Sequence, residues 1–193
     1  MITCPRRLLF GGLFPLLFLY WSPLCGQDSI PPSGHFEVEL EPAAFIFRGY
    51  TLNMGFQSGP FRVSVKSFAV NQPRLFVGNQ HVAVQSSGIG FEVNYLFRPG
   101  RTPFVGALSD FYSDQLFARS THGNGLQKSV SAGVRIGYRH LFGEMATDYR
   151  GCYLSGSLAA FRKLDAGDLV IAGEHYAPRS LYLIPAVNVG YRF

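Results

Sequence analysis

The sequence has few cysteines, one tryptophan and few charged side chains. Its 193 residues include three Cys and one Trp, and 15% are Asp, Glu, Lys or Arg. Cys4, Trp21 and Cys25 all lie within the first 26 residues, which leaves Cys152 as the only cysteine of the remaining chain. One cysteine excludes an internal disulfide framework, so another source of stability is needed. We interpret Cys152 as a small apolar strand residue rather than a reactive thiol.

Only one long apolar run is present, and it lies near the start of the chain. Arg6 and Arg7 precede the uncharged residues 8–20 (LLFGGLFPLLFLY), and a Ser-Pro break and Gly26 follow. This order predicts a secretory signal peptide over residues 1–26 and a mature domain over residues 27–193. The alternatives are a retained signal anchor and lipidation of Cys25, although the residues before Cys25 lack the pattern that lipidation sites favour.

Removal of this segment leaves a weakly charged single domain. It takes away two arginines and no acidic residue, so the formal net charge falls from +5 to +3. A charge this small does not indicate nucleic-acid binding. The 167 residues that remain fit one domain.

Beyond residue 26 there is no helical periodicity of useful length, but two-residue alternation occurs repeatedly. Val130, Val134 and Ile136, for example, alternate with small or charged residues such as Arg135. Such alternation predicts strands with one apolar face. The expected strands cover residues 36–41, 50–57, 61–66, 89–97, about 103–112, 130–139, about 151–163 and 181–193.

The closing segment, residues 181–193 (LYLIPAVNVGYRF), carries the most specific pattern. Phe193, Tyr191 and Val189 fall on one face, and Arg192 and Gly190 fall on the other. The segment resembles the last strand of bacterial outer-membrane β-barrels, whose terminal aromatic residue is read by the assembly machinery. The resemblance implies that Tyr191 and Phe193 form an assembly signal, and that the partners include outer-membrane lipids, the barrel-assembly machinery and periplasmic chaperones.

The distribution of aromatic residues favours a membrane barrel over a soluble sheet, although alternation alone fits both. Tyr50 and Phe56 bracket one apolar face, and Tyr95, Tyr138 and Tyr191 lie near other strand ends. Rings at strand ends are typical of the girdles that barrels place at lipid headgroups. A secreted lipocalin-type binder is the soluble alternative. The charged residues expected to face inward are Arg62, Lys66, Glu92, Arg135 and Arg139.

The predicted connections alternate in length, as they do in outer-membrane barrels. The second, fourth and sixth are the short ones, at residues 58–60, 98–102 and 141–150. The third, fifth and seventh are longer, at about 71–86, 113–126 and 164–180. The first connection, residues 42–49, is apolar, and we leave open whether it is strand, a kink or a short helical plug.

Candidate chemistry is sparse. The five histidines show no metal-ligand spacing and are interpreted as surface residues; they are His35, His81, His122, His140 and His175. Asp110 and Asp114 are interpreted as part of a solvated rim. Asp165 to Asp168 is interpreted as a turn, because it lacks the distal Glu of a calcium loop. Ser120-Thr121-His122 resembles a feature of outer-membrane lipid A hydrolases, but neighbouring residues say little about a triad.

We predict an all-β, eight-stranded antiparallel up-and-down transmembrane β-barrel of the OmpA/OmpX/OmpW-like kind in the bacterial outer membrane. An eight-stranded interior is about filled by side chains, so we expect a structural or surface-interaction role. A narrow porin-like channel for small solutes is the alternative, and a lipid-modifying enzyme is a weaker one. We expect no catalytic residues, cofactor or metal.

Overall fold

The computed structural model describes residues 34–73, 77, 81–98, 101–118, 123–142, 150–165, 167, 169–171 and 174–193. The predicted signal peptide and Cys25 lie outside these residues, so both stay predictions. Among the described residues, no helix has the length and apolar character needed to cross a membrane.

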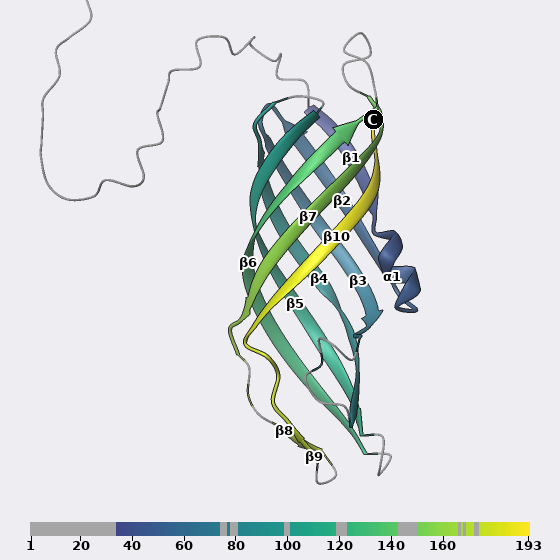
Figure 1. Ribbon diagram of the computed structural model, residues 1–193, viewed down its shortest axis with the longest axis vertical. Helices are drawn as coiled ribbons and strands as arrows, with labels where there is room; N and C mark the ends of the chain where they lie inside the picture. The colour runs from purple at the N-terminus through teal and green to yellow at the C-terminus, as the bar shows by residue number, and fades with distance from the viewer. Residues whose placement is uncertain are drawn as a thin grey trace, which may run out of the picture. The chain divides into compact units, whose positions relative to one another are not determined.

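Eight antiparallel strands close into a barrel in the order β1-β10-β7-β6-β5-β4-β3-β2 (Figure 1). Each strand pairs with its sequence neighbour in the wall, and β10 pairs with β1 to close it. The barrel strands are β1 (Gly34–Leu40), β2 (Tyr50–Ser58), β3 (Phe61–Asn71), β4 (Val82–Leu96), β5 (Arg101–Ala118), β6 (Asn124–Leu141), β7 (Gly151–Lys163) and β10 (Leu181–Arg192). This confirms the predicted eight-stranded up-and-down barrel. We call the end that holds Phe193 the terminal end and the opposite end the loop end.

The two-residue alternation assigns the faces as predicted. Val134 is 63% exposed on the outside of β6, and its neighbour Arg135 is buried inside. The predicted outer residues of the other strands are exposed and apolar in the same way; they include Met54, Phe56, Val63, Val65, Ile89, Phe91, Val93, Ile136, Leu183, Val187 and Val189. The outer wall is therefore an apolar surface, as a bilayer-facing wall must be.

Four strands extend further toward the loop end than the sequence predicted, and the first of them is β3, which continues to Asn71. β4 begins at Val82, β5 continues to Ala118 and β6 begins at Asn124, so the fifth connection contains only residues 119–123 rather than about 113–126. Near the loop end, the inner residues Val82, Val84, Leu116 and Ala118 are apolar and pack against Val77 and Tyr176. Tyr176 belongs to a hairpin in the seventh connection, formed by β8 (Leu169–Ile171) and β9 (Glu174–Tyr176). This packing stabilises strand structure in segments that were predicted to be loop because their outward-facing residues are polar.

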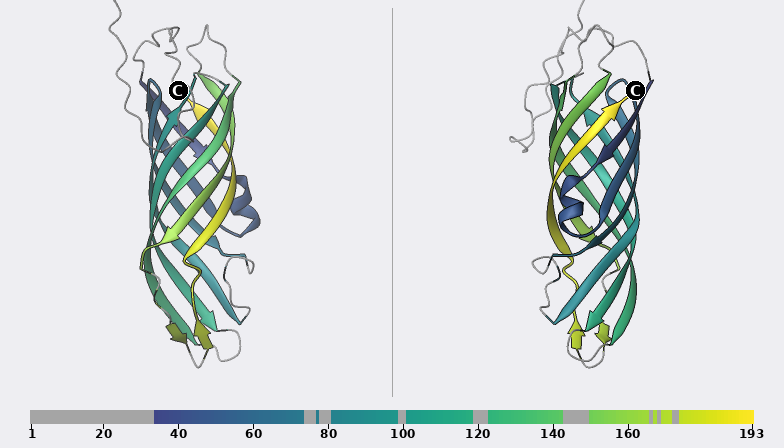
Figure 2. Two further views of the ribbon diagram at one scale, coloured as in Figure 1. Left: turned by 60° about the vertical axis from the view of Figure 1, so that its left-hand side comes forward. Right: turned by 90° about the vertical axis from the view of Figure 1, so that its right-hand side faces the viewer.

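The first connection contains a short helix, α1 (Pro42–Ile46). It lies in the barrel wall against β10 and β2, on the side facing the viewer in the right-hand view of Figure 2. The rings of Phe45 and Phe47 are exposed, and Ala44 is buried. Of the alternatives left open by the sequence, the connection is therefore helical. However, it is part of the wall and does not plug the lumen.

The barrel wall is incompletely paired beside α1. β1 pairs with β10 only from Glu37 to Leu40, opposite Arg192 to Val189. Residues 181–188 of β10 pair with β7 alone. The Phe193 amide donates to the Phe36 carbonyl of β1, and the β10–β7 register is unbroken, so every second residue back from Phe193 directs its backbone nitrogen to the same flank. Pro185 is one of these residues and has no N–H, as expected on an unpaired edge.

Candidate functional site

The terminal half of the lumen is filled by seven ionised side chains. Three carboxylates and four guanidinium groups from five strands meet there; we call them the ion-pair cluster, formed by Glu37, Glu39, Glu92, Arg62, Arg135, Arg139 and Arg192. All seven are at most 6% exposed. Charges this deeply buried are stable only when they are paired and hydrogen-bonded.

Glu37 lies at the centre of the ion-pair cluster. Its Oε2 accepts from Arg62 Nε at 2.6 Å. Its Oε1 lies 2.9 Å from Arg139 Nη1 and 2.8 Å from Arg192 Nη2. The Tyr153 hydroxyl donates to Oε2 at 3.3 Å. One carboxylate thus joins strands β1, β3, β6, β7 and β10 across the lumen.

Glu39 and Glu92 complete the pairing. Glu39 lies 3.1 Å from Arg62 Nη2 and 3.5 Å from Arg139 Nη2. Glu92 accepts from Arg135 Nη1 at 2.8 Å and from the Ser64 hydroxyl at 3.3 Å. These contacts confirm that the charged residues predicted to face inward do so. The sequence did not indicate which of them would meet.

Inward-facing glycines provide the space for these long side chains. A Cβ at Gly55 would lie 2.9 Å from an Arg62 guanidinium nitrogen, and a Cβ at Gly190 would lie 2.3 Å from the Tyr153 ring. The glycines among the predicted inner residues are thus part of the packing of the cluster.

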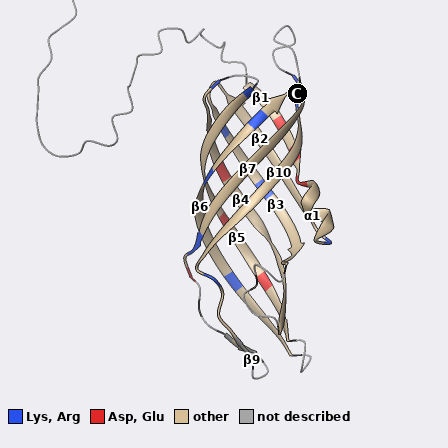
Figure 3. Cartoon of the chain, in the orientation of Figure 1, with Lys and Arg blue, Asp and Glu red and all other residues tan. Residues whose placement is uncertain are grey.

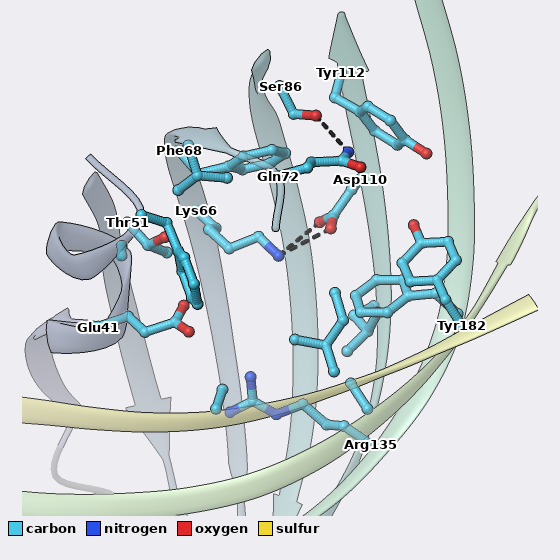
Figure 4. A pocket seen from close by; sticks show the side chains of 18 of the residues that line it. Glu41, Thr51, Lys66, Phe68, Gln72, Ser86, Asp110, Tyr112, Arg135 and Tyr182 are labelled. Atoms are coloured by element: carbon cyan, nitrogen blue, oxygen red, sulfur yellow. Dashed lines mark hydrogen bonds and ion pairs between the residues drawn. The ribbon is translucent and has the colours of Figure 1, made fainter. Parts of the chain in front are cut away.

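The loop half of the lumen contains a cavity of about 230 Å³ (Figure 4). We call it the loop-half cavity. Its floor is polar and includes Glu92, Arg135 and Asn53. Its walls are largely apolar or aromatic and include Phe68, Val70, Leu108, Ala159, Phe161, Tyr182 and Ile184.

A salt bridge crosses one wall of the loop-half cavity. Lys66 Nζ lies 2.9 Å and 3.0 Å from the two carboxylate oxygens of Asp110, and Figure 4 shows Lys66 reaching toward Asp110. The ammonium also lies 5.3 Å from the Phe68 ring centroid and 5.7 Å from that of Phe161. Such contacts favour a cation in partly apolar surroundings.

The interpretation of Asp110 and Asp114 as a solvated rim is wrong. Asp110 is 7% exposed and Asp114 is fully buried. Asp114 lies 3.2 Å from Lys163 Nζ and accepts a hydrogen bond from the Ser86 hydroxyl. Both aspartates face the lumen because β5 continues to Ala118, beyond the strand end that the sequence predicted.

An apolar cluster lies between the loop-half cavity and the loop end. It consists of Val77, Val82, Val84, Leu116, Ala118 and Tyr176. Tyr176 also lines the cavity, and burial raises the pKa of its hydroxyl to about 12. The cavity is thus bounded by an apolar cluster on one side and by the ion-pair cluster on the other.

The described histidines differ in how far their side chains are buried. His35 is buried, and its Nδ1 lies 3.4 Å from the Phe193 carbonyl oxygen, so its interpretation as a surface residue is wrong. It is buried because it faces inward on β1. The His140 ring is partly buried and packs against Phe142. His81 is exposed. Within the described ranges, no group of three or more potential ligands could hold a metal ion.

Of the other residues singled out in the sequence, the described ones are not part of the ion-pair cluster or the loop-half cavity. Asp165 accepts from the Val130 amide at 2.8 Å, and the turn predicted over residues 165–168 includes residues outside the described ones, so it stays a prediction. Cys152 is exposed on the outer face of β7. Ser120, Thr121 and His122 lie outside the described residues, as do Asp168 and the side chain of His175.

Aromatic side chains form an exposed ring at the terminal end, as predicted. Phe36 packs against Phe56, Phe61 against Tyr95, and Tyr191 against Phe193, with ring centroids 4.9–5.4 Å apart. Figure 3 shows, by contrast, that most of the strand length carries no charged residue.

Comparison with solved structures identifies the same architecture in other proteins. Neisserial surface protein A superposes with a TM-score of 0.53 and 11% sequence identity, over 83% of this chain and 96% of that one. A major outer membrane protein from Thermus thermophilus gives 0.52 and 12%, over 83% of this chain and all of that one. No protein-family model matches the sequence, and no curated protein matches it. At these identities the likeness concerns the fold, and this chain has the fold of small outer-membrane β-barrel proteins.

Proposed function

We propose that this chain is an integral outer-membrane protein with a closed lumen, and that its role is structural or consists of binding at its surface. The role that we propose is not a catalytic one. The apolar outer wall and the aromatic ring at the terminal end support insertion into a bilayer. The strand order supports it too, because lipid offers no hydrogen bonds to a free sheet edge: the sheet closes through β1 and β10, and α1 packs against β10 where β1 has ended.

The observation that carries the closed-lumen part is the ion-pair cluster. Its side chains extend across the terminal half from five strands, and Glu37, Glu39 and Arg62 are at most 1% exposed. A solute that crosses the barrel along its axis must separate these pairs. Removing one partner of a buried pair typically costs about 3–5 kcal/mol, so spontaneous opening is rare.

Single-channel recording in planar bilayers tests this proposal. We expect no stepwise conductance from the refolded protein at concentrations at which a general porin conducts. The matched variant is Glu39→Ala combined with Arg139→Ala, which removes one acid and one base and creates space in the cluster. Steady conductance steps from the unmodified protein would favour the alternative, a narrow channel for small solutes.

Location is tested separately, by fractionation and gel mobility. We expect the protein in the outer-membrane fraction, soluble only with detergent, and with a mobility that changes on boiling. Recovery as a soluble periplasmic monomer would support the lipocalin-type alternative.

We also propose that Tyr191 and Phe193 act as the assembly signal, read by the barrel-assembly machinery after periplasmic chaperones deliver the chain. Tyr191 pairs with Val38 at the seam where the barrel closes, and both rings are exposed, by 46% and 57%. An exposed aromatic pair on the closing strand suits recognition before closure.

A further inference from the structure

The wall of the loop-half cavity is made of different elements on its α1 side. β1 ends at Leu40 and β2 begins at Tyr50, so α1 occupies the position between β10 and β2 (Figure 2). Ala44 and Phe47, from α1 and its C-terminal end, line the cavity. Phe47 is also 37% exposed at the outer surface. One side chain therefore contacts both the cavity and the surroundings of the barrel.

The strand opposite α1 has no strand partner on that side. Residues 181–188 of β10 pair only with β7, and within the described part of the chain no backbone hydrogen bond joins α1 to β10. Ile184 and Ala186 face the cavity from this strand, and their neighbours Leu183 and Val187 are exposed on the apolar outer wall. The weakest part of the wall thus lies at the level of the hydrocarbon, if the barrel is inserted as proposed.

The axial directions are more strongly closed than this side. Toward the terminal end lies the ion-pair cluster, and toward the loop end lies the apolar cluster that includes Leu116 and Tyr176. A molecule that moves past α1 separates no ion pair and no sheet hydrogen bond. Among the described residues, the side beside α1 is therefore the route from the bilayer to the cavity that breaks the fewest interactions.

The polar floor of the cavity has hydrogen-bonding groups without partners. Within the part of the chain that the structure describes, Asn53 is 3% exposed and its Oδ1 accepts no hydrogen bond, and Arg135 is 6% exposed and its Nε donates none. Glu41 also lines the cavity; the Thr51 hydroxyl bonds to its carboxylate, but among the described residues it makes no ion pair. Figure 4 shows Glu41 beside α1 and Arg135 across the cavity from it. Buried polar groups are normally satisfied, and Asn53 and Arg135 differ from other buried polar residues such as Asn94 in lining a cavity that has room for a partner.

These groups specify what the partner offers. Asn53 Oδ1 requires a donor, the Glu41 carboxylate has room for donors beside Thr51, and Arg135 Nε requires an acceptor. Hydroxyl groups supply both. A carboxylate or phosphate head would supply only acceptors and would leave Asn53 Oδ1 without a donor. The volume of about 230 Å³ exceeds the roughly 150 Å³ of a cavity that binds benzene, which suits one alkyl chain rather than two.

We propose that the loop-half cavity binds a single-chain amphiphile with an uncharged hydroxylated head, which enters from the bilayer beside α1. Its head hydrogen-bonds to Asn53, Arg135 and Glu41, and its chain lies against Phe68 and Ile184. This inference rests on the proposed membrane insertion, which the experiment measures independently.

The test uses tryptophan fluorescence in phosphatidylcholine vesicles. Trp21 is the only tryptophan, so Trp21→Phe combined with Phe68→Trp places a single reporter on the cavity wall. Trp21→Phe combined with Phe91→Trp places one on the outer wall, where Phe91 is 47% exposed. The probe is a monoacylglycerol with a brominated chain, because bromine quenches tryptophan on contact. Brominated phosphatidylcholine and a brominated fatty acid are the comparison probes.

We expect the brominated monoacylglycerol to quench the Phe68→Trp reporter saturably, and unlabelled monoacylglycerol to reverse the effect. Brominated phosphatidylcholine should quench the Phe91→Trp reporter and leave the Phe68→Trp reporter bright. The fatty acid should require at least a tenfold higher concentration. Quenching of the cavity reporter by phosphatidylcholine, or at a lower concentration of fatty acid, would overturn the proposed ligand class.

A pair of asparagine variants tests the site itself. In the Phe68→Trp background, Asn53→Leu should weaken binding of the monoacylglycerol about tenfold. Asn94→Leu is the matched control, because Asn94 is similarly buried and also has side-chain atoms without hydrogen-bond partners but does not line the cavity. Equal effects of both substitutions would overturn the proposal.

Failure of this inference is distinguishable from failure of the proposed function. If the Phe91→Trp reporter is not quenched by brominated phosphatidylcholine, the protein is not in the bilayer and the proposed function fails. A second outcome is that this reporter is quenched and the gel shift on boiling is intact, but the monoacylglycerol does not quench the cavity reporter. In that case the membrane barrel is supported and the proposed binding site is wrong.

Discussion

The two halves of the barrel interior are built from the same alternating pattern but are filled in opposite ways. In the terminal half, eight strands surround the ion-pair cluster, where Glu37 contacts three arginines. In the loop half, β1 has ended, α1 takes its place and a cavity of about 230 Å³ remains. The comparison teaches that inward-facing charge alone does not close a lumen. Charges are paired in both halves, but only in the terminal half, where every strand has two strand neighbours, do the paired side chains fill the lumen.

The largest difference between the halves should appear on removal of Glu37. Glu37→Ala leaves Arg62, Arg139 and Arg192 without their shared carboxylate in a fully buried site, so the free energy of unfolding should fall by about 3–5 kcal/mol. Urea unfolding in vesicles, followed by gel mobility, measures this. Glu92→Gln should act in the same direction with a smaller effect, because among the described residues only Arg135 loses its ion-pair partner, and the Gln oxygen still accepts a hydrogen bond. A loss below about 1 kcal/mol for Glu37→Ala, less than a typical hydrogen bond to a charged group contributes, would show that the terminal half is hydrated.

Both halves of the barrel should have the same apolar outer wall. Val134 lies on that wall near the boundary between the halves, so substitutions there test the assignment of faces. Val134 precedes Arg135, which belongs to the ion-pair cluster and lines the cavity. Val134→Arg should lower the free energy of unfolding in vesicles by about 2–4 kcal/mol if the residue faces the bilayer midplane. Val134→Leu is the control and should be nearly neutral. Equal tolerance of both would contradict the assignment of faces.

A smaller effect is expected from the salt bridge of the loop half. Lys66→Met leaves Asp110 without its cation, but both side chains border the cavity and are 14% and 10% exposed. The expected loss of unfolding free energy is about 1–3 kcal/mol. Adding Asp110→Leu should restore much of it, because the unpaired charge is then removed. If Lys66→Met costs more than Glu37→Ala, the contrast between the halves is wrong.

The smallest effect on stability is expected at Phe193. Its deletion removes one exposed ring from the end of β10 and the amide bond to Phe36. The stability of the refolded barrel should therefore change by about 1 kcal/mol or less. In cells, the same deletion should reduce insertion. Surface levels measured at equal synthesis check this, and levels equal to those of the intact chain would count against an assembly signal.

The alternation in the sequence predicted the strands and their faces, but it made the four strands β3, β4, β5 and β6 too short at the loop end. Polar residues such as Ser113 and Gln115 were predicted to lie in a loop, because the sequence around them shows no clear apolar face. They belong to β5, since the inner residues Leu116 and Ala118 pack against Tyr176 of a hairpin more than 50 residues later. The same error placed Asp110 and Asp114 at a solvated rim. Tertiary packing, rather than local propensity, decided both cases.

By itself, the sequence determined that the chain forms eight strands, which residues face outward and that the inward set is charged. The physical reason is local, because side chains alternate across an extended strand whatever lies beside it. The tertiary structure decided which charges meet, that residues 42–46 form a helix in the wall and that a cavity remains beside the ion-pair cluster. These depend on how closure staggers the strands, which brings Glu37 against Arg139, 102 residues away. No local sequence pattern predicts a contact between residues so far apart in the chain.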